Sequence, residues 1–304
     1  MLVRSSIKQY LYPMNKLPLH KRVQILNLLV EGSSLRATSR ICDVSINTVT
    51  KLLVDVGKAC QKFHDDTVKG LICNKVQADE IWSFVYSKEK NVPEGKDGEA
   101  GDVWTFVGID ADTKLVVSWL VGARDYDTAT VFMGDIASRV SNRMQLTTDG
   151  LKAYMAAVND NFGGQIDFAQ LIKIYGTPEG ETQTERKYSP YECTGTKKAV
   201  VSGNPDEKYI STSFVERQNL TMRMHMRRFT RLTNAFSKKV ENHCHAIALH
   251  FVYYNFVKIH KTLRVTPAME AKLMKRVMSL EDIANLVPDE PPKKRGNYKK
   301  KKPQ

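Results

Sequence analysis

The sequence lacks the features that mark disulfide-rich, secreted and membrane-spanning proteins. Its five cysteines include no Cys-x-x-Cys pair, which indicates neither a disulfide framework nor a zinc ribbon. No run approaches the roughly 18 apolar residues that cross a bilayer, and the N-terminal stretch MLVRSSIKQYLYPMNK has no signal-peptide apolar segment. We therefore predict a cytoplasmic protein with reduced cysteines and no membrane partner.

Acidic residues are scarce relative to basic ones. The chain has 46 lysines and arginines against 33 aspartates and glutamates, which gives a formal net charge of +13. This imbalance is typical of proteins that bind phosphate backbones, although a basic protein of a membrane surface would share it. With 304 residues the chain is long enough for one large domain or two modest ones, and we expect two.

The first part of the chain has the periodicity of three helices. An apolar helical face (VQILNLL) is followed by Ser33 and Ser34, which are available to cap a second helix, and Ser45 is placed to cap a third. Two short helices followed by a longer one predict a helix-turn-helix DNA-binding domain over residues 1–72. The first turn of the third helix would then present four DNA-binding residues, Asn47, Thr48, Thr50 and Lys51. A plain three-helix bundle has the same pattern, but residues 1–75 hold 12 Lys/Arg and only 5 Asp/Glu, which favours DNA binding.

After Cys73 the periodicity changes from helical to extended. The segments KVQADEIWSFVYSK, VWTFVGID, LVVSWLVGA, MQLTTDG and QIDFAQLIKIY predict five strands. Two helices are expected among them, TATVFMGDIASRV with Asp127 as its cap, and LKAYMAAV. This order predicts a mixed α/β sheet. Residues 175–210 contain three prolines and four glycines, and we predict an irregular insertion there.

Several acids fall at predictable places in these strands. Asp79 lies in the middle of the first strand, where an unpaired charge is costly, and its neighbour Glu80 must point to the opposite face, so that only one of the two can serve a given site. Asp149 closes the fourth strand, which in this topology can lie beside the first. Taken alone, Asp79 could sit on an exposed strand face and Asp149 could be a turn former. Asp110 and Asp112 are better explained as hairpin-turn residues.

A third acid lies in a segment rich in arginine. The chain has no Gly or Pro between Ser211 and Pro267, which favours long helices. On a helix that starts near Ser213, an apolar stripe is formed by Val215, Met222, Met226 and Phe229. The adjacent polar face carries Glu216, Asn219, Arg223 and Arg227. Glu216 could be an intrahelical salt-bridge partner, but packing of the stripe on the sheet would turn it toward the strand ends that bear Asp79 and Asp149.

Three converging carboxylates predict a metal site. They repel one another unless divalent cations bind, and Mg²⁺ accepts such hard oxygen ligands, with Mn²⁺ as a substitute. Two such ions can activate a water or a DNA 3′-hydroxyl on one side of a phosphodiester and stabilise the leaving oxygen on the other. Arg223 and Arg227 would hold the flanking phosphates, with Asn219 on the same DNA-binding face.

The motifs around these acids resemble those of a known family. ADEIWSFV, TTDGLKAY and FVERQNLTMRMHMRR are similar to the acid-bearing motifs of transposases of the bacterial insertion-sequence-one family, within the DDE transposase and retroviral integrase superfamily. The resemblance implies an RNase H-like catalytic domain over residues 73–268, with Asp79, Asp149 and Glu216 as the catalytic and metal-binding triad. It also puts Arg223 where such enzymes place a basic residue on the active-site side of the helix. Residues 269–304 would form a C-terminal helix and a basic tail.

On this interpretation the chain is a DNA transposase that performs Mg²⁺-dependent strand cleavage and strand transfer at insertion-sequence ends. Its partners would be double-stranded DNA, as element ends and target, and at least one further copy of itself, in a prokaryotic, nucleoid-associated setting. Two alternatives stay open. One is a non-enzymatic helix-turn-helix DNA-binding regulator, and the other is a metal-dependent endonuclease that never joins strands.

Overall fold

The N-terminal part of the protein is a group of three helices. The computed structural model describes residues 17–96, 98–176, 192–230 and 233–288. Its first helices are α1 (Leu19–Val30), α2 (Leu35–Cys42) and α3 (Ile46–Thr67). The serine caps are confirmed, because Ser34 accepts a hydrogen bond from the backbone N–H of Ala37, and Ser45 from that of Asn47. Residues 1–16 of the predicted N-terminal domain lie outside the described residues.

A six-stranded mixed sheet forms the centre of the molecule. Its strands are β1 (Lys75–Val85), β2 (Gly101–Asp110), β3 (Val116–Gly122), β4 (Gln145–Thr148), β5 (Asp167–Gly176) and β6 (Glu192–Ser202). Their order across the sheet is β3-β2-β1-β4-β5-β6. Strand β1 is antiparallel to β2 and parallel to β4, and β5 is parallel to β4 and antiparallel to β6. The expected mixed α/β sheet, with β4 beside β1, is therefore confirmed.

Strand β6 corrects the prediction of an irregular insertion. It lies within residues 175–210 and pairs with β5 over most of its length. Its sequence, ECTGTKKAVVS, has no clean alternation of apolar and polar residues, since most of the strand is exposed at the edge of the sheet. Pairing with β5 supplies the backbone hydrogen bonds that the composition did not suggest. A short helix, η3 (Glu207–Tyr209), follows, and residues 177–191 lie outside the described part.

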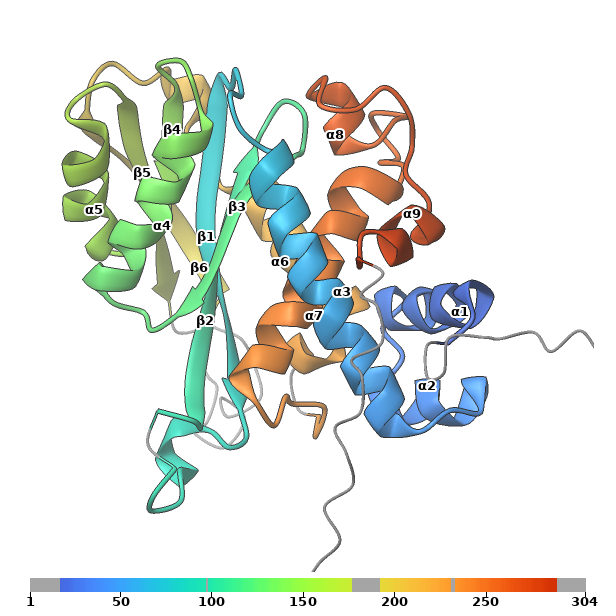
Figure 1. Cartoon of the computed structure of the whole chain (residues 1–304). Helices are drawn as coiled ribbons and strands as arrows, with labels where there is room; N and C mark the ends of the chain where they lie inside the picture. Colours follow the sequence, from blue (N-terminus) through green and yellow to red (C-terminus); the bar gives the residue numbers. More distant parts are fainter. Residues whose placement is uncertain (1–16, 97, 177–191, 231–232, 289–304) are drawn as a thin grey trace, which may run out of the picture.

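Helices cover both faces of the sheet (Figure 1). One face carries α4 (Tyr126–Arg139) and α5 (Ala153–Phe162), and the other carries α6 (Ser213–His225), α7 (Val240–Val252) and α3. The cap of α4 is Asp125, whose Oδ1 accepts from the N–H of Thr128 at 2.9 Å. The prediction of Asp127 as the cap was wrong by two residues, because Asp127 already lies in the first helical turn.

The segment after Ser211 divides into separate helices. Helix α6 begins at Ser213 as predicted, but it ends at His225, where Met226 adopts an extended conformation before the 3₁₀ helix η4 (Arg227–Phe229). All four residues of the predicted apolar stripe are buried. After this turn Met226 and Phe229 are both buried, the latter beside the ring of His243. The long α6 helix expected from the lack of Gly and Pro was therefore wrong, and of the predicted stripe Met226 and Phe229 lie beyond the helix, although they are buried.

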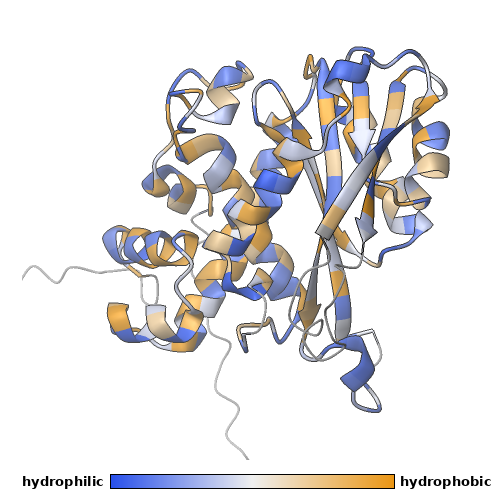
Figure 2. Cartoon of the chain, turned by 180° about the vertical axis from the view of Figure 1, so that it is seen from behind, coloured by the Kyte–Doolittle hydropathy of each residue, from blue (hydrophilic) through white to orange (hydrophobic). Residues whose placement is uncertain are grey.

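The remaining elements follow α7 or lie in the loop between β1 and β2. Helix α7 continues into the π-helix η5 (Tyr253–Val257), and α8 (Pro267–Glu270) and α9 (Leu280–Asn285) follow. A short helix, η1 (Glu89–Asn91), lies in the loop between β1 and β2, which is hydrophilic in Figure 2. The predicted basic tail lies largely in residues 289–304, outside the described residues. Of the helices in the described part of the chain, none has both the length and the apolar character that spanning a bilayer requires.

One hydrophobic core joins the N-terminal helices to the sheet. Helix α3 approaches α7 so closely that a Cβ on Gly57 would lie 2.4 Å from the Cβ of His245. Near the end of α3, the rings of His64 and Trp119 of β3 have centroids 4.2 Å apart. Apolar residues line the surfaces where these helices meet the sheet (Figure 2). The division into domains at residue 72 stays a prediction.

Candidate functional site

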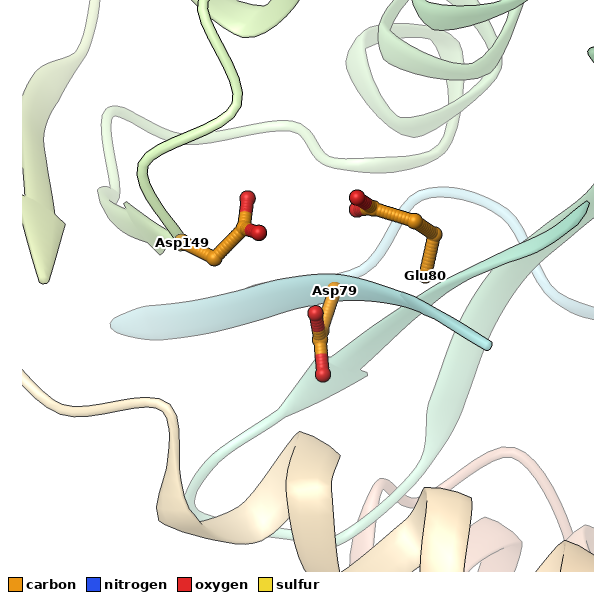
Figure 3. Close-up of side chains that lie close together, drawn as sticks. All are labelled: Asp79, Glu80 and Asp149. Atoms are coloured by element: carbon orange, nitrogen blue, oxygen red, sulfur yellow. The ribbon is translucent and has the colours of Figure 1, made fainter. Parts of the chain in front are cut away.

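Three carboxylates meet where β1 runs past the end of β4. The parallel ladder between the two strands ends at the pair Ala78 and Thr148. Asp79 and Glu80 follow along β1, and Asp149 follows the last residue of β4. Each acid has one carboxylate oxygen within 4.8 Å of the others (Figure 3). Two separate stretches of sequence therefore deliver acids to one place, which we call the acidic site (Asp79, Glu80 and Asp149).

Glu80 lies in the same group of acids as its neighbour Asp79. Its side chain does leave β1 on the side opposite to Asp79, and Figure 3 shows Glu80 and Asp149 turned toward each other. Even so, both neighbours have an oxygen in the same group. The reason is that β4 ends at Thr148, so β4 no longer borders β1 at these positions and side chains from either face reach the gap. The two side chains leave the strand on opposite sides as predicted, yet both acids border one site; whether only one of them serves it stays a prediction.

Burial and mutual repulsion raise the pKa values of these acids. Burial, followed by the negative charges of Glu80 and Asp149, raises the pKa of Asp79 to about 7. Burial also raises the pKa of Glu80, with the charge of Asp149 as the next cause, and it raises the pKa of Asp149 itself. Carboxylates in such surroundings are costly to ionise unless positive charge is near.

Polar side chains dock α6 on the face of β1 that carries Asp79. Oε1 of Gln77 accepts hydrogen bonds from the backbone N–H groups of Phe214, at 2.8 Å, and Val215, at 3.2 Å. Nδ2 of Asn219 donates to Oδ2 of Asp79 at 2.9 Å. Gln77 and Asp79 share a face because side chains alternate along a strand. Strand β1 therefore determines where the first turns of α6 lie.

Glu216 lies beside the acidic site but is not a member of the group. Its Oε2 is 2.6 Å from Nζ of Lys173 on β5, and the hydroxyl of Thr212 donates to its Oε1. After burial, the charge of Glu216 is among the causes that raise the pKa values of Asp79 and Asp149. Its ion pair among the described residues is with a lysine of the sheet, whereas the alternative expected a partner on its own helix. Asp79 and Asp149 are thus brought together directly, with Glu216 next to them.

Arg124 closes the other side of the acidic site. Its Nε donates to Oε1 of Glu80 at 2.6 Å, and its Nη2 is 3.5 Å from Oδ2 of Asp149. The guanidinium lies 4.9 Å from the ring centroid of Trp104. The second oxygen of Glu80 accepts a hydrogen bond from the hydroxyl of Tyr154 at 3.1 Å. Two cations, Arg124 and the lysine at Glu216, therefore flank the acids.

The aspartates expected in turns are in turns. Oδ1 of Asp110 accepts from the N–H of Asp112, and its Oδ2 accepts from Thr113 in the β2–β3 hairpin. Asp149 has a turn role as well, because its Oδ1 accepts from the N–H of Leu151 at 3.1 Å. For Asp149 the turn alternative and the acidic site are compatible, since the turn uses one oxygen and leaves the second beside the acids.

The predicted DNA-binding residues near the acids lie in different settings. Asn219 is buried and contacts Asp79, so its amide nitrogen is committed to the acidic site. Arg223 is half-buried on α6. Arg227 is exposed in η4, beyond the end of α6, so the expectation that it shares the polar face of this helix was wrong.

The four predicted DNA-binding residues of α3 are exposed to different degrees. Asn47 and Lys51 are exposed, whereas Thr48 and Thr50 are half-buried. The hydroxyl of Thr50 donates to the carbonyl of Ile46, and Lys51 forms an ion pair with Asp55 one turn later. DNA contact through this turn stays a prediction.

Sequence reasoning missed the residues that surround the acids. Gln77 precedes Asp79 by two positions, so strand alternation could have placed it on the same face. Arg124 lies between the predicted third strand and the following helix, where side chains reach the end of a sheet, but nothing in GARDYD singles it out. Lys173 and Tyr154 carry no local signal, because their roles depend on which strands are neighbours.

The acidic site fits a divalent cation. It offers one oxygen from each of three carboxylates within 4.8 Å, and Mg²⁺ and Mn²⁺ prefer such ligands. A further hard oxygen, Oδ1 of Asn219, is buried and without a hydrogen-bond partner among the described residues. A divalent cation bound here would oppose the burial and the mutual repulsion that raise the pKa values of the acids.

The chain is thus a mixed α/β protein with an acidic, metal-compatible site at the end of a central strand. No protein-family model and no characterised protein sequence matches it. Among solved structures, a pre-cleavage Mos1 transpososome is 14% identical with a TM-score of 0.22, and the similarity covers 51% of this chain and 60%, less than two thirds, of that one. A piggyBac transposase synaptic complex with hairpin DNA is 9% identical with a TM-score of 0.41, covering 88% of this chain and 69% of that one. The Mos1 strand transfer complex is 12% identical with a TM-score of 0.23, covering 90% and 80%.

Proposed function

We propose that this protein is a DNA transposase that uses divalent metal ions to cleave DNA strands at the ends of an insertion sequence and to transfer them to target DNA. The observation that carries the proposal is the meeting of Asp79 and Asp149, 70 residues apart in the sequence, with Glu216 of α6 held beside them. The resemblance of the three motifs around these acids to those of insertion-sequence-one transposases supports the same conclusion.

In this proposal Asp79, Asp149 and Glu216 hold the metal, in a domain of RNase H-like type. Bound Mg²⁺ would supply Lewis-acid activation of a water or 3′-hydroxyl and stabilise the leaving oxygen of the phosphodiester. Lys173 occupies the position beside Glu216 and neutralises part of the negative charge there. Asn219 holds Asp79 through its amide, which restricts the carboxylate to one orientation.

DNA would reach this site through basic and polar groups on α6, η4 and α3. Arg223 and Arg227 are proposed to contact phosphates near the acids. The first turn of α3, with Asn47 and Lys51 exposed, is proposed to recognise the element ends in the manner of a helix-turn-helix. Because transposition holds two ends together, we propose that the active form is a dimer or a higher homo-oligomer.

Replacing the acids tests the enzymatic proposal. Asp79→Asn and Glu216→Gln should each lower the rate of end cleavage and strand joining by at least about 100-fold, because a neutral amide holds a divalent cation poorly. Binding to an end fragment should persist. The measurement is cleavage and joining of labelled end fragments with Mg²⁺ or Mn²⁺, and gel-shift binding in EDTA.

The matched control is Glu281→Gln, an exposed acid in the first turn of α9, which should cleave and join like the unchanged protein. The same assay separates the alternatives. A DNA-binding regulator would show no cleavage in any variant, and a plain endonuclease would cut DNA that lacks element ends and would not join strands.

A further inference from the structure

Arg124 and Glu80 form an ion pair in which the two side chains differ strongly in exposure. Its partner Glu80 is almost completely buried, with 1% of its side chain exposed, whereas 40% of the Arg124 side chain is exposed. The carboxylate of Glu80 is therefore buried, whereas the guanidinium of Arg124 is accessible at the acidic site. The guanidinium is accessible beside Asp149, with its Nη2 3.5 Å from Oδ2 of that acid.

The guanidinium is held firmly while some of its donors remain available. Nε and Nη2 both contact the same oxygen of Glu80, Oε1, and the other oxygen of Glu80 is engaged by Tyr154. The face of Trp104 supports the group from a second direction. Arginine carries five N–H donors in a planar fork, and among the described residues Nη1 makes no hydrogen bond.

The chemistry of the available donors indicates an anion with oxygen acceptors. Arg124 lies at the rim of three carboxylates that would repel a DNA phosphate, and its Nη2 is 3.5 Å from Asp149. A half-exposed guanidinium with unused N–H groups is well suited to bind a phosphate. Because Arg124 lies next to Asp149, the phosphate that it binds would be one close to the cleaved bond.

We propose that Arg124 binds a phosphate of the DNA strand that is cut, and that Glu80 and Tyr154 hold its guanidinium for this contact. The inference rests on the proposed function of the acidic site. Glu80 and Tyr154 act as positioning residues, because they contact Arg124 or its partner and not the DNA. Within this proposal Glu80 serves the site through the arginine.

The test combines Arg124→Gln with substrates in which single phosphates near the cut are replaced by neutral methylphosphonates. The variant should cut about 10- to 100-fold more slowly, since one charge-assisted hydrogen-bond contact is lost. In the unchanged protein one methylphosphonate position should slow cleavage, and in Arg124→Gln this position should have no further effect. Without metal, the slope of log binding constant against log salt should become shallower by about 0.9.

Two further variants guard against a folding defect and test the positioning. Tyr154→Phe removes only the hydroxyl that binds Glu80, and it should lessen the methylphosphonate effect at the same position while the fold is retained. Arg143→Gln is the matched control, because Arg143 is 43% exposed and also paired, with Asp167, but precedes β4 and so lies at the other end of that strand from Asp149. It should leave cleavage and the methylphosphonate profile unchanged.

The possible results separate this inference from the proposed function. If the unchanged protein cuts element ends but Arg124→Gln keeps the full methylphosphonate profile and salt slope, Arg124 has a structural role and the inference is overturned. If neither the unchanged protein nor any variant cuts or joins element ends, the proposed function fails and the inference fails with it.

Discussion

His243 of α7 lies buried between two serine hydroxyls. Its Nε2 is 3.2 Å from Oγ of Ser83, and its Nδ1 is 3.3 Å from Oγ of Ser237. Burial, followed by the positive charge of Arg228, lowers the pKa of His243 to about 3. Because a histidine in an unfolded chain has a pKa of about 6.5, the unfolded state takes up a proton at mildly acidic pH that the folded state does not.

We expect this residue to make stability depend on pH. Its stabilising contribution is complete above about pH 6.5 and is lost as the pH falls toward 3, at about 1.4 kcal/mol of unfolding free energy per pH unit. His243→Gln, which cannot take up this proton, should reduce the slope by that amount. Urea unfolding between about pH 4 and pH 7 measures it. Equal slopes in the two proteins would contradict the prediction.

At the scale of elements, the start of α6 depends on β1. The residue that precedes the helix, Thr212, makes no capping hydrogen bond to the first turn. Gln77 of β1 accepts from the N–H groups of Phe214 and Val215 instead. A strand side chain thus provides the cap, and the same strand carries Asp79, so the acids of β1 and α6 are held in register.

Removing this cap should loosen α6 selectively. Gln77→Leu places an apolar side chain of similar size at this buried position and leaves two N–H groups without their acceptor, which should cost about 1 to 3 kcal/mol of stability. Hydrogen exchange at Phe214 and Val215 should become faster. Amides in α7 serve as the internal control and should change only as much as global stability does, so uniform acceleration across both helices would count against a local cap.

For the whole molecule, the decisive contact is that of α3 with α7. Gly57 permits it, because a Cβ at this position would lie 2.4 Å from the Cβ and 2.7 Å from the backbone of His245. Through this contact the N-terminal helices and the sheet share one core. The position of α3, and of the proposed DNA-binding turn at its start, relative to the acidic site follows from it.

A larger side chain at this contact should therefore destabilise the whole protein. Gly57→Val should lower the free energy of unfolding by about 1 to 3 kcal/mol, because the atoms that it meets include backbone that cannot move aside. Ala59→Val, two residues further along α3 and half-buried, is the control and should have a smaller effect. The measurement is urea unfolding of the full chain. A similar decrease in the free energy of unfolding in both variants would contradict a specific role for the close contact at Gly57.

Much of the local structure could be predicted from the sequence. The caps Ser34 and Ser45 and the first five strands follow from patterns within a few residues, since capping and strand periodicity are local effects. The start of α6 at Ser213 belongs to the same class. Strand β6 and the end of α6 at His225 could not be predicted, because an edge pairing and a buried turn leave no clear local pattern. The cap of α4 was misplaced by two residues because Asp125 and Asp127 carry the same local signal.

The sequence by itself determined that Asp79 lies within a strand, that Asp149 ends another and that Glu216 starts a helix, because each depends on neighbouring residues. Only the tertiary structure decided what surrounds these acids. Strand β4 ends one position before Asp149, so the carboxylates of Glu80 and Asp79 can lie in the same group. The neighbouring strand β5 brings Lys173 to Glu216. These contacts join residues far apart in the chain, so they follow from strand order and strand ends, which local patterns do not contain.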